Sequence, residues 1–142
     1  MKRFLLEIDG GAWGNPGEAG AGVLIVYPDG QEEEHQVYLG RATNNVAEYA
    51  ALLAGLLRLL ELGAEEVEIV TDSQLLANQL NGSYRVRAPH LKPLFARAQA
   101  YLARFARTTV RHIPREANRR ADRLATQAIL ERCSTLPSPL AP

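Results

Sequence analysis

The fold is decided by residues 67–74, which read Val67-Glu68-Ile69-Val70-Thr71-Asp72-Ser73-Gln74. The first five of these residues are mostly β-branched, which is typical of a short strand buried on both faces of a sheet. Asp72 and Ser73 then mark the junction with a short helix that runs to about Leu80. A buried strand that passes directly into a helix indicates the parallel half of a mixed sheet.

The residues before this strand predict one long helix and three strands. Apolar side chains recur at helical spacing between residues 44 and 62, where Asn44 or Asn45 can cap the start and Gly63 ends the helix. Turns rich in glycine and proline separate the earlier apolar runs. These runs predict an antiparallel meander of three strands, at residues 3–9, 20–27 and 34–39.

The residues after this strand predict a basic connector followed by a helix, a strand and a last helix, at residues 94–106, 108–113 and 118–132. The order of elements is that of an α/β protein whose mixed sheet has an antiparallel half, a parallel half and helices on both faces. Strand ends that meet helix starts form a natural ligand crevice. We expect one domain over residues 1–132 and a disordered tail over residues 133–142.

The composition is that of a globular protein with an uneven charge distribution. Its 142 residues are 46% hydrophobic, and because no stretch is apolar enough for a membrane span, we expect a cytoplasmic protein without a membrane partner. Cys133 is the single cysteine, which excludes an internal disulfide and a cysteine-based metal site. Residues 1–72 carry four basic and thirteen acidic side chains, and residues 73–142 carry twelve and three. This division fits either two solvated faces of opposite sign or a phosphate-binding surface.

Four acidic residues are candidates for a metal site: Asp9, Glu48, Asp72 and Asp122. Each alone has a structural explanation, as a turn residue, an N-cap or a charge in the first turn of a helix. However, Asp9 and Asp72 both end apolar strands, so in one sheet they would lie side by side at the same edge. Converging carboxylates raise one another's pKa unless a cation neutralises them. Oxygen ligands without a Cys/His cluster favour Mg²⁺ or Mn²⁺ over zinc.

The four acids stand in blocks that resemble, in order and spacing, the four signature blocks of type 1 ribonuclease H. The resemblance covers the chain up to about residue 130, and its blocks are Asp9-Gly10-Gly11 with Gly14-Asn15-Pro16-Gly17, Thr43-Asn44-Asn45-Val46-Ala47-Glu48, Thr71-Asp72-Ser73-Gln74, and Asn118-Arg119-Arg120-Ala121-Asp122-Arg123-Leu124-Ala125. It implies a ribonuclease H-like fold, with a five-stranded mixed sheet of three antiparallel and two parallel strands.

The resemblance also implies the activity. A member of this family is expected to hydrolyse the RNA strand of RNA/DNA hybrids with two divalent cations, Mg²⁺ or Mn²⁺, leaving 3′-hydroxyl and 5′-phosphate ends. By the same resemblance Asp9 bridges both ions, Glu48 and Asp72 support one, and Asp122 holds the other. The expected partner is a hybrid, with duplex RNA as a second substrate to be tested, and we expect a monomer.

Several other residues match family positions that contact the nucleic acid. Side-chain amides suit 2′-hydroxyls and base edges without demanding one sequence, and the backbone of the first block and Glu48 are expected to reach a 2′-hydroxyl. The expected substrate-binding residues here are Gly10, Gly11, Asn15, Asn44, Asn45 and Gln74. The asparagines also fit turn and capping roles, and one residue can serve in both.

Two residues are candidates for assisting catalysis. His112 stands ten residues before Asp122, the spacing of the family's assisting histidine, but it ends an expected strand instead of lying in a glycine-rich loop, which is equally consistent with a structural histidine. Arg115 is permanently charged and lies nearby in the sequence. We therefore expect Arg115 to be the assisting group and His112 the second candidate.

The connector after residue 80 is too short for the extra basic helix that some family members use to hold the hybrid. The sequence therefore resembles the short form of the family, and we expect phosphate contacts to come instead from Arg85, Arg87 and Lys92. Three alternatives stay open: another nuclease or strand transferase on the same fold, a non-catalytic module that binds hybrids or duplex RNA, and a structural or protein-binding domain. The presence of all four acids favours the enzyme.

Overall fold

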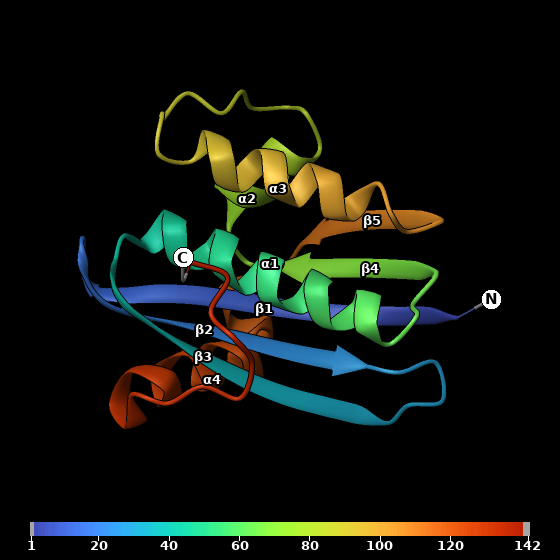
Figure 1. The fold of residues 1–142 in the computed structure, drawn as a ribbon, viewed down its shortest axis with the longest axis horizontal. Coiled ribbons are helices and arrows are strands. Elements are labelled where there is room, and N and C mark those ends of the chain that lie inside the picture. The colour runs from blue at the N-terminus through green and yellow to red at the C-terminus, as the bar shows by residue number, and fades with distance from the viewer. Residues whose placement is uncertain (1, 141–142) are drawn as a thin grey trace.

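The computed structural model describes residues 2–140 and contains a five-stranded mixed sheet with helices on both faces (Figure 1). The strands are β1 (Arg3–Gly14), β2 (Gly17–Val26), β3 (Glu32–Ala42), β4 (Glu66–Thr71) and β5 (Arg107–His112). The helices are α1 (Asn44–Glu61), α2 (Gln74–Leu80), α3 (Lys92–Leu102) and α4 (Arg119–Glu131), with a 3₁₀ turn at Arg115–Ala117. The strand order is β3-β2-β1-β4-β5, with β1, β2 and β3 antiparallel and β1, β4 and β5 parallel. The predicted fold class is confirmed.

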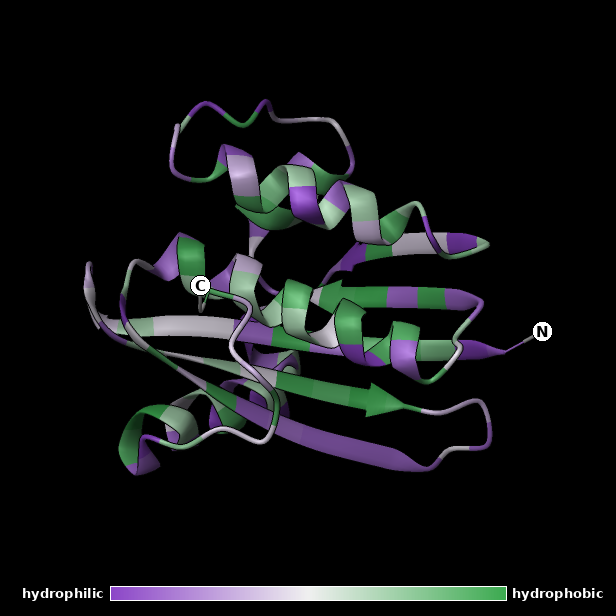
Figure 2. Ribbon diagram, viewed as in Figure 1, coloured by the Kyte–Doolittle hydropathy of each residue, from purple (hydrophilic) through white to green (hydrophobic). Residues whose placement is uncertain are grey.

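Helices cover both faces of the sheet. On one face α1 packs against β1 and β2 and also against α3, and on the other face α4 packs against β2 and β3. Because β2 is covered on both faces, it is almost entirely apolar, whereas the edge strand β3 is largely hydrophilic (Figure 2). Among the described residues, no helix has the length and apolar character needed to cross a membrane.

The third helix ends four residues earlier than expected. The sequence pattern predicts a helix to residue 106, but α3 stops at Leu102. The backbone amides of Ala106 and Arg107 both donate to the Glu65 carbonyl, at 2.9 and 3.2 Å, and Phe105 is buried in the core. The chain therefore leaves the helix to begin β5 beside β4, a tertiary contact that the local pattern does not contain.

The register of β1 and β4 places the end of β4 beside the middle of β1. Their parallel pairing runs from Arg3–Glu66 to Ile8–Thr71. Beyond this last pair β1 continues along β2 to Gly14, whereas the chain after β4 turns away into α2. Asp9 and Asp72 are the next residues on the two strands, so they follow adjacent positions at the point where the strands separate.

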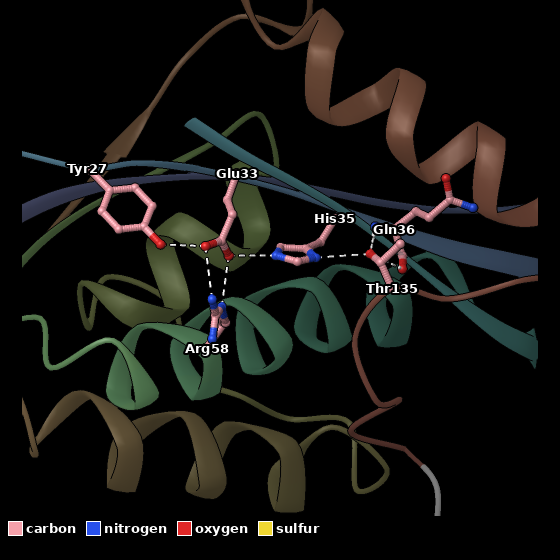
Figure 3. A network of polar contacts seen from close by, with 6 residues as sticks. All are labelled: Tyr27, Glu33, His35, Gln36, Arg58 and Thr135. Atoms are coloured by element: carbon pink, nitrogen blue, oxygen red, sulfur yellow. Dashed lines mark hydrogen bonds and ion pairs between the residues drawn. The ribbon is translucent and has the colours of Figure 1, made fainter. Parts of the chain in front are cut away.

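The C-terminal segment is ordered, which corrects the expectation of a disordered tail at residues 133–142; of these, residues 141–142 lie outside the described part of the chain. Residues 133–140 cross the edge of the sheet formed by β3. The Thr135 amide donates to the Gln36 carbonyl at 2.8 Å, and the Gln36 amide donates to the Thr135 hydroxyl at 2.9 Å. The Thr135 hydroxyl also contacts His35, which reaches the Glu33–Arg58 ion pair (Figure 3). An edge strand has free backbone groups, and this segment satisfies part of them.

Candidate active site

Four acidic side chains from four different elements line one open pocket of about 560 Å³. Asp9 comes from β1, Glu48 from α1, Asp72 from the β4–α2 junction and Asp122 from α4. Asp9, Glu48 and Asp72 each offer a carboxylate oxygen within 4.8 Å of the others. Asp122 lies outside this group of three but lines the same pocket and acts electrostatically on Asp9. The four residues that the sequence singled out are therefore brought together.

The position of Glu48 depends on a close approach between β1 and α1. The backbone amide of Gly10 donates a hydrogen bond to the Glu48 carboxylate. A Cβ atom at residue 10 would lie 2.3 Å from the carbonyl carbon and oxygen of Ala47, which is closer than atoms can approach. Glycine at this position therefore lets the helix carry Glu48 to the side of Asp9.

The position of Asp122 depends on a similar approach on the other face of the sheet. Gly22 of β2 pairs with Asp9 of β1. A Cβ atom at residue 22 would lie 2.0 Å from the carbonyl oxygen of Ala121, the residue before Asp122. The absence of a side chain at Gly22 thus brings the first turn of α4 against the strand that carries Asp9.

Asp72 is held at the start of a capped helix. Ser73 is the N-cap of α2, and its hydroxyl accepts a hydrogen bond from the Leu76 amide at 3.1 Å. The Ser73 amide in turn donates to the Thr71 hydroxyl at 3.0 Å, which fixes the turn between β4 and α2. The local geometry is that of a strand ending directly in a helix.

The pocket strongly opposes negative charge unless a cation is present. Burial, together with the nearby carboxylates of Glu48, Asp72 and Asp122, raises the pKa of Asp9 to about 9. Burial and then Asp72 raise the pKa of Glu48 to about 8, against the lowering effect of the Gly10 amide and the Ser73 hydroxyl. Asp9 and Glu48 are each only 8% exposed. Carboxylate oxygens that repel in this way form a donor set that suits hard cations such as Mg²⁺ and Mn²⁺.

The predicted amide residues lie around the pocket with different contacts. Asn44 and Asn45 line it, and the Asn44 side-chain oxygen accepts from the Ala12 amide at 2.8 Å. Asn15 accepts from the Asn44 amide at 3.0 Å, so it supports the pocket from behind. Gln74 is exposed at the first position of α2 and is not among the residues that line the pocket. Gly10 and Gly11 line the pocket through the β1 backbone.

Arg115 and His112 occupy different places. Arg115 lines the pocket together with the four acids. His112 is the last residue of β5, is exposed, and its Nε2 lies 3.3 Å from the backbone carbonyl of Asp72. It does not line the pocket. Arg115 therefore lies at the acidic pocket, whereas His112 lies outside it.

The basic connector lies apart from the acidic pocket. It joins α2 to α3 over residues 81–91, which contain no helix, and its side chains do not line the pocket. Arg85, Arg87 and Lys92 are exposed, and none of them forms an ion pair with another described residue.

Part of the charge asymmetry is neutralised within the fold. Ion pairs join basic residues of the second half of the chain to acidic residues of the first half: Arg111–Glu68, Arg120–Glu32, Arg120–Glu34 and Arg132–Glu18. These arginines are thereby engaged by carboxylates. Arg85, Arg87, Lys92 and Arg115 have no such partner within residues 2–140.

Two residues near the acids were not assigned a role from the sequence. Ser73 lines the pocket and lowers the pKa of Glu48, and its place directly after Asp72 at a strand-to-helix junction was the available signal. Asn118 is completely buried, and its side-chain amide contacts the Ile8 carbonyl and the Asp72 carboxylate. It begins the fourth signature block, but its place before a helix is also that of an ordinary helix cap.

The fold and the pocket together define the class of ribonuclease H-like proteins: a five-stranded sheet of order β3-β2-β1-β4-β5 whose acids converge where β1 and β4 separate. Comparison with known proteins agrees. The family model described as Reverse transcriptase-like matches residues 7–128. The Bifunctional protein Rv2228c of Mycobacterium tuberculosis is 42% identical over 129 residues, which are 89% of this chain and 35% of that relative. This chain therefore spans little more than a third of that relative's length.

Two solved structures extend the comparison to three dimensions. RNase H1 from the halophilic archaeon Halobacterium salinarum NRC-1 has a TM-score of 0.86 and 39% identity, covering 92% of this chain and 99% of that chain. LC11-RNase H1, solved in complex with an RNA/DNA hybrid, has a TM-score of 0.85 and 41% identity, covering 91% and 98%. This chain belongs to the ribonuclease H family, type 1.

Proposed function

We propose that this chain is an endonuclease that hydrolyses the RNA strand of RNA/DNA hybrids, with two divalent cations bound by Asp9, Glu48, Asp72 and Asp122. The observation that carries the proposal is the convergence of the first three carboxylates within 4.8 Å, in a pocket that Asp122 also lines. The hybrid as substrate is supported by the similarity to LC11-RNase H1, whose structure contains one. We further propose that the chain acts as a monomer in the cytoplasm.

The donor set fits Mg²⁺ and equally Mn²⁺, because it consists of carboxylate oxygens, and burial and neighbouring carboxylates raise the pKa of two of its members, Asp9 and Glu48. When bound, two such ions would lower the pKa of the attacking water and stabilise the departing 3′-oxygen, giving 3′-hydroxyl and 5′-phosphate ends. Asp9 is central among the acids, since Glu48, Asp72 and Asp122 all act on its charge. We therefore propose it as the bridging ligand, with Glu48 and Asp72 on one side and Asp122 on the other.

The protein's own groups orient the substrate around these acids. Asn44, Asn45, Gly10 and Gly11 line the pocket, where side-chain amides and backbone groups would contact 2′-hydroxyls and base edges. Asn15 holds the backbone of Asn44 in place. Gln74, which is exposed at the start of α2 and lies outside the pocket lining, would add a further contact. None of these groups selects one base, which fits cleavage without sequence preference.

Arg115 is proposed to stabilise negative charge on the scissile phosphate, because it is permanently charged and lines the pocket. His112 lies beside the Asp72 backbone and is the second candidate. Flanking phosphates would be held by the three basic residues near the connector, Arg85, Arg87 and Lys92.

The test uses end-labelled substrates and a metal-free control. The RNA/DNA hybrid, duplex RNA, duplex DNA and single strands are incubated with the wild-type protein with and without Mg²⁺ or Mn²⁺, and with Asp72→Asn. We expect metal-dependent cleavage of the hybrid's RNA strand and a loss of at least about 100-fold in the variant, which removes one charged ligand but keeps the side chain's shape.

Hybrid binding by Asp72→Asn is the control that separates chemistry from substrate affinity. The variant should retain binding in a filter or polarisation assay without metal, because the amide and backbone contacts are untouched. Cleavage of the hybrid without any divalent ion, or unchanged cleavage by Asp72→Asn, would refute the proposed mechanism. Binding without cleavage by the wild-type protein would favour the non-catalytic module instead.

A further inference from the structure

Asn118 joins three parts of the chain that carry acids. Its side-chain Nδ2 donates to the carbonyl of Ile8, the residue before Asp9, at 2.8 Å. The same nitrogen lies 3.4 Å from Oδ2 of Asp72. Its backbone carbonyl accepts from the amide of Asp122 at 3.2 Å. One residue is therefore bonded to β1 directly before one acid, to the side chain of a second and to the backbone of a third.

The location of Asn118 explains why a single side chain can reach both strands. The pairing of β1 and β4 ends at Ile8 and Thr71, and beyond that pair the two strands separate. The side-chain amide of Asn118 lies at this point, because it contacts both the Ile8 carbonyl of β1 and the carboxylate of Asp72. It therefore links the residue before Asp9 to Asp72, the residue that follows β4.

The side chain does not do what an asparagine before a helix ordinarily does. Asn118 precedes α4, but it makes no side-chain capping bond to that helix. It is completely buried, and its Oδ1 has no hydrogen-bond partner among the described residues. An unpartnered buried oxygen lowers stability. The residue is thus not arranged for the best stability of α4, and its donor is directed at the acidic cluster.

We propose that Asn118 is a positioning residue for the acidic cluster, which sets the distance between Asp9 and Asp72 through its shared amide. The inference rests on the proposed function, because it concerns the ligands of the divalent ions. It adds to that function a residue that is uncharged and does not line the pocket, and whose role is to hold Asp9 and Asp72 at the right distance from each other. Groups that orient metal ligands typically change metal affinity or activity about 10- to 100-fold when they are removed.

The variant Asn118→Ser removes the shared amide. Because the Asn118 side chain makes no capping bond to α4, and serine is well accepted before a helix, α4 and its first turn should be retained. Its shorter side chain cannot reach both the Ile8 carbonyl and Asp72. We expect kcat on the hybrid to fall about 10- to 100-fold, with KM changed by less than about threefold. The Mg²⁺ concentration that gives half of the metal-induced shift in Tm should rise by a similar factor.

The matched control is Gln79→Ala, which removes another buried amide. Gln79 accepts from the Tyr49 hydroxyl at 2.5 Å and does not line the acidic pocket. It should lose stability while keeping the wild-type kcat and Mg²⁺ midpoint at a temperature where both variants are folded. Should Asn118→Ser not fold, Asn118→Gly decides the matter, because glycine is also accepted at N-cap positions.

The outcomes are distinct. Loss of kcat and a raised Mg²⁺ midpoint in Asn118→Ser, with neither change in Gln79→Ala, support the positioning role. Wild-type values in Asn118→Ser, or equal losses in both variants, overturn it. The Mg²⁺-dependent Tm is measured without substrate, so a wild-type protein that binds Mg²⁺ but leaves hybrids intact would defeat the proposed function and still test the role of Asn118.

Discussion

Replacing Asp9 by asparagine should make the metal-free protein more stable while abolishing hydrolysis. Burial and three neighbouring carboxylates raise the pKa of Asp9 from its ordinary value of 3.8 to about 9. The folded protein therefore holds a proton that the unfolded chain releases between these two pH values. The contribution of this protonated carboxyl group to the free energy of unfolding is therefore fully present below about pH 4, and it is lost as the pH rises toward about 9.

The size of the effect follows from the same pKa. A pH of 7 lies about three units above the ordinary pKa of the Asp9 carboxyl group in the unfolded chain. At about 1.4 kcal/mol per unit, this difference lowers the free energy of unfolding by about 4 kcal/mol. Water entering the open pocket and relaxation of the side chains reduce this value, so we expect Asp9→Asn to gain about 1–3 kcal/mol. For a chain of 142 residues this is a Tm increase of about 3–10 °C.

The assay is thermal unfolding followed by circular dichroism in EDTA at pH 5, 6, 7 and 8. The difference between Asp9→Asn and wild type should grow with pH, and added Mg²⁺ should stabilise wild type more than the variant. Asp29→Asn is the matched control, because Asp29 is an exposed acid in a turn outside the pocket. A variant no more stable than wild type at pH 8 without metal would refute the proposed repulsion among the acids.

Three further predictions concern the surroundings of the acids. Arg115→Ala should lower kcat about 10- to 100-fold, whereas His112→Ala should stay within about threefold, and steady-state kinetics with one hybrid and one metal compares them; equal values would remove the arginine from the mechanism. Gly22→Ala should lower the free energy of unfolding in urea by about 1–3 kcal/mol or more and should also lower kcat, because its Cβ would push α4 away. Gly11→Ala is the control for stability, because its Cβ would meet nothing within 4 Å. The third prediction concerns the variant in which Arg85, Arg87 and Lys92 are all replaced by alanine. The slope of the logarithm of the hybrid binding constant against the logarithm of the salt concentration should become less steep by about three units, and an unchanged slope would exclude phosphate contacts by these side chains.

The fold was predictable because its local signals agree with its global arrangement. The helical spacing of apolar residues in α1 and the buried run of β4 were enough to predict a mixed sheet covered by helices, and the family resemblance implied its five strands. What the sequence could not reveal depends on contacts between distant residues. The early end of α3 is set by the bonds from residues 106 and 107 to Glu65, and the ordered tail is set by the free edge of β3.

The same distinction applies to the site. The four acids were identifiable because each stands in a recognisable sequence block, in the order and spacing of the family. That Asp9 and Asp72 would lie side by side at one edge of a sheet was also expected, and the pairing of β1 with β4 confirms it. The closeness of Glu48 depends on the approach of α1 to Gly10, which the sequence pattern does not contain. The role proposed for Asn118 was not accessible, because its two bonds reach residues 110 and 46 positions away. From the sequence alone, an asparagine that caps a helix cannot be distinguished from one whose side chain donates to a distant strand.

The wide separation of the acids along the chain has a consequence for synthesis. The pocket needs side chains from β1, α1, the β4–α2 junction and α4, so it is complete only when residue 122 has been made and α4 has docked. The meander of β1, β2 and β3 can form earlier from local contacts, but it contains only Asp9 of the four. Until residue 122 has been made and α4 has docked, a growing polypeptide on the ribosome therefore carries part of the sheet without a complete acidic pocket.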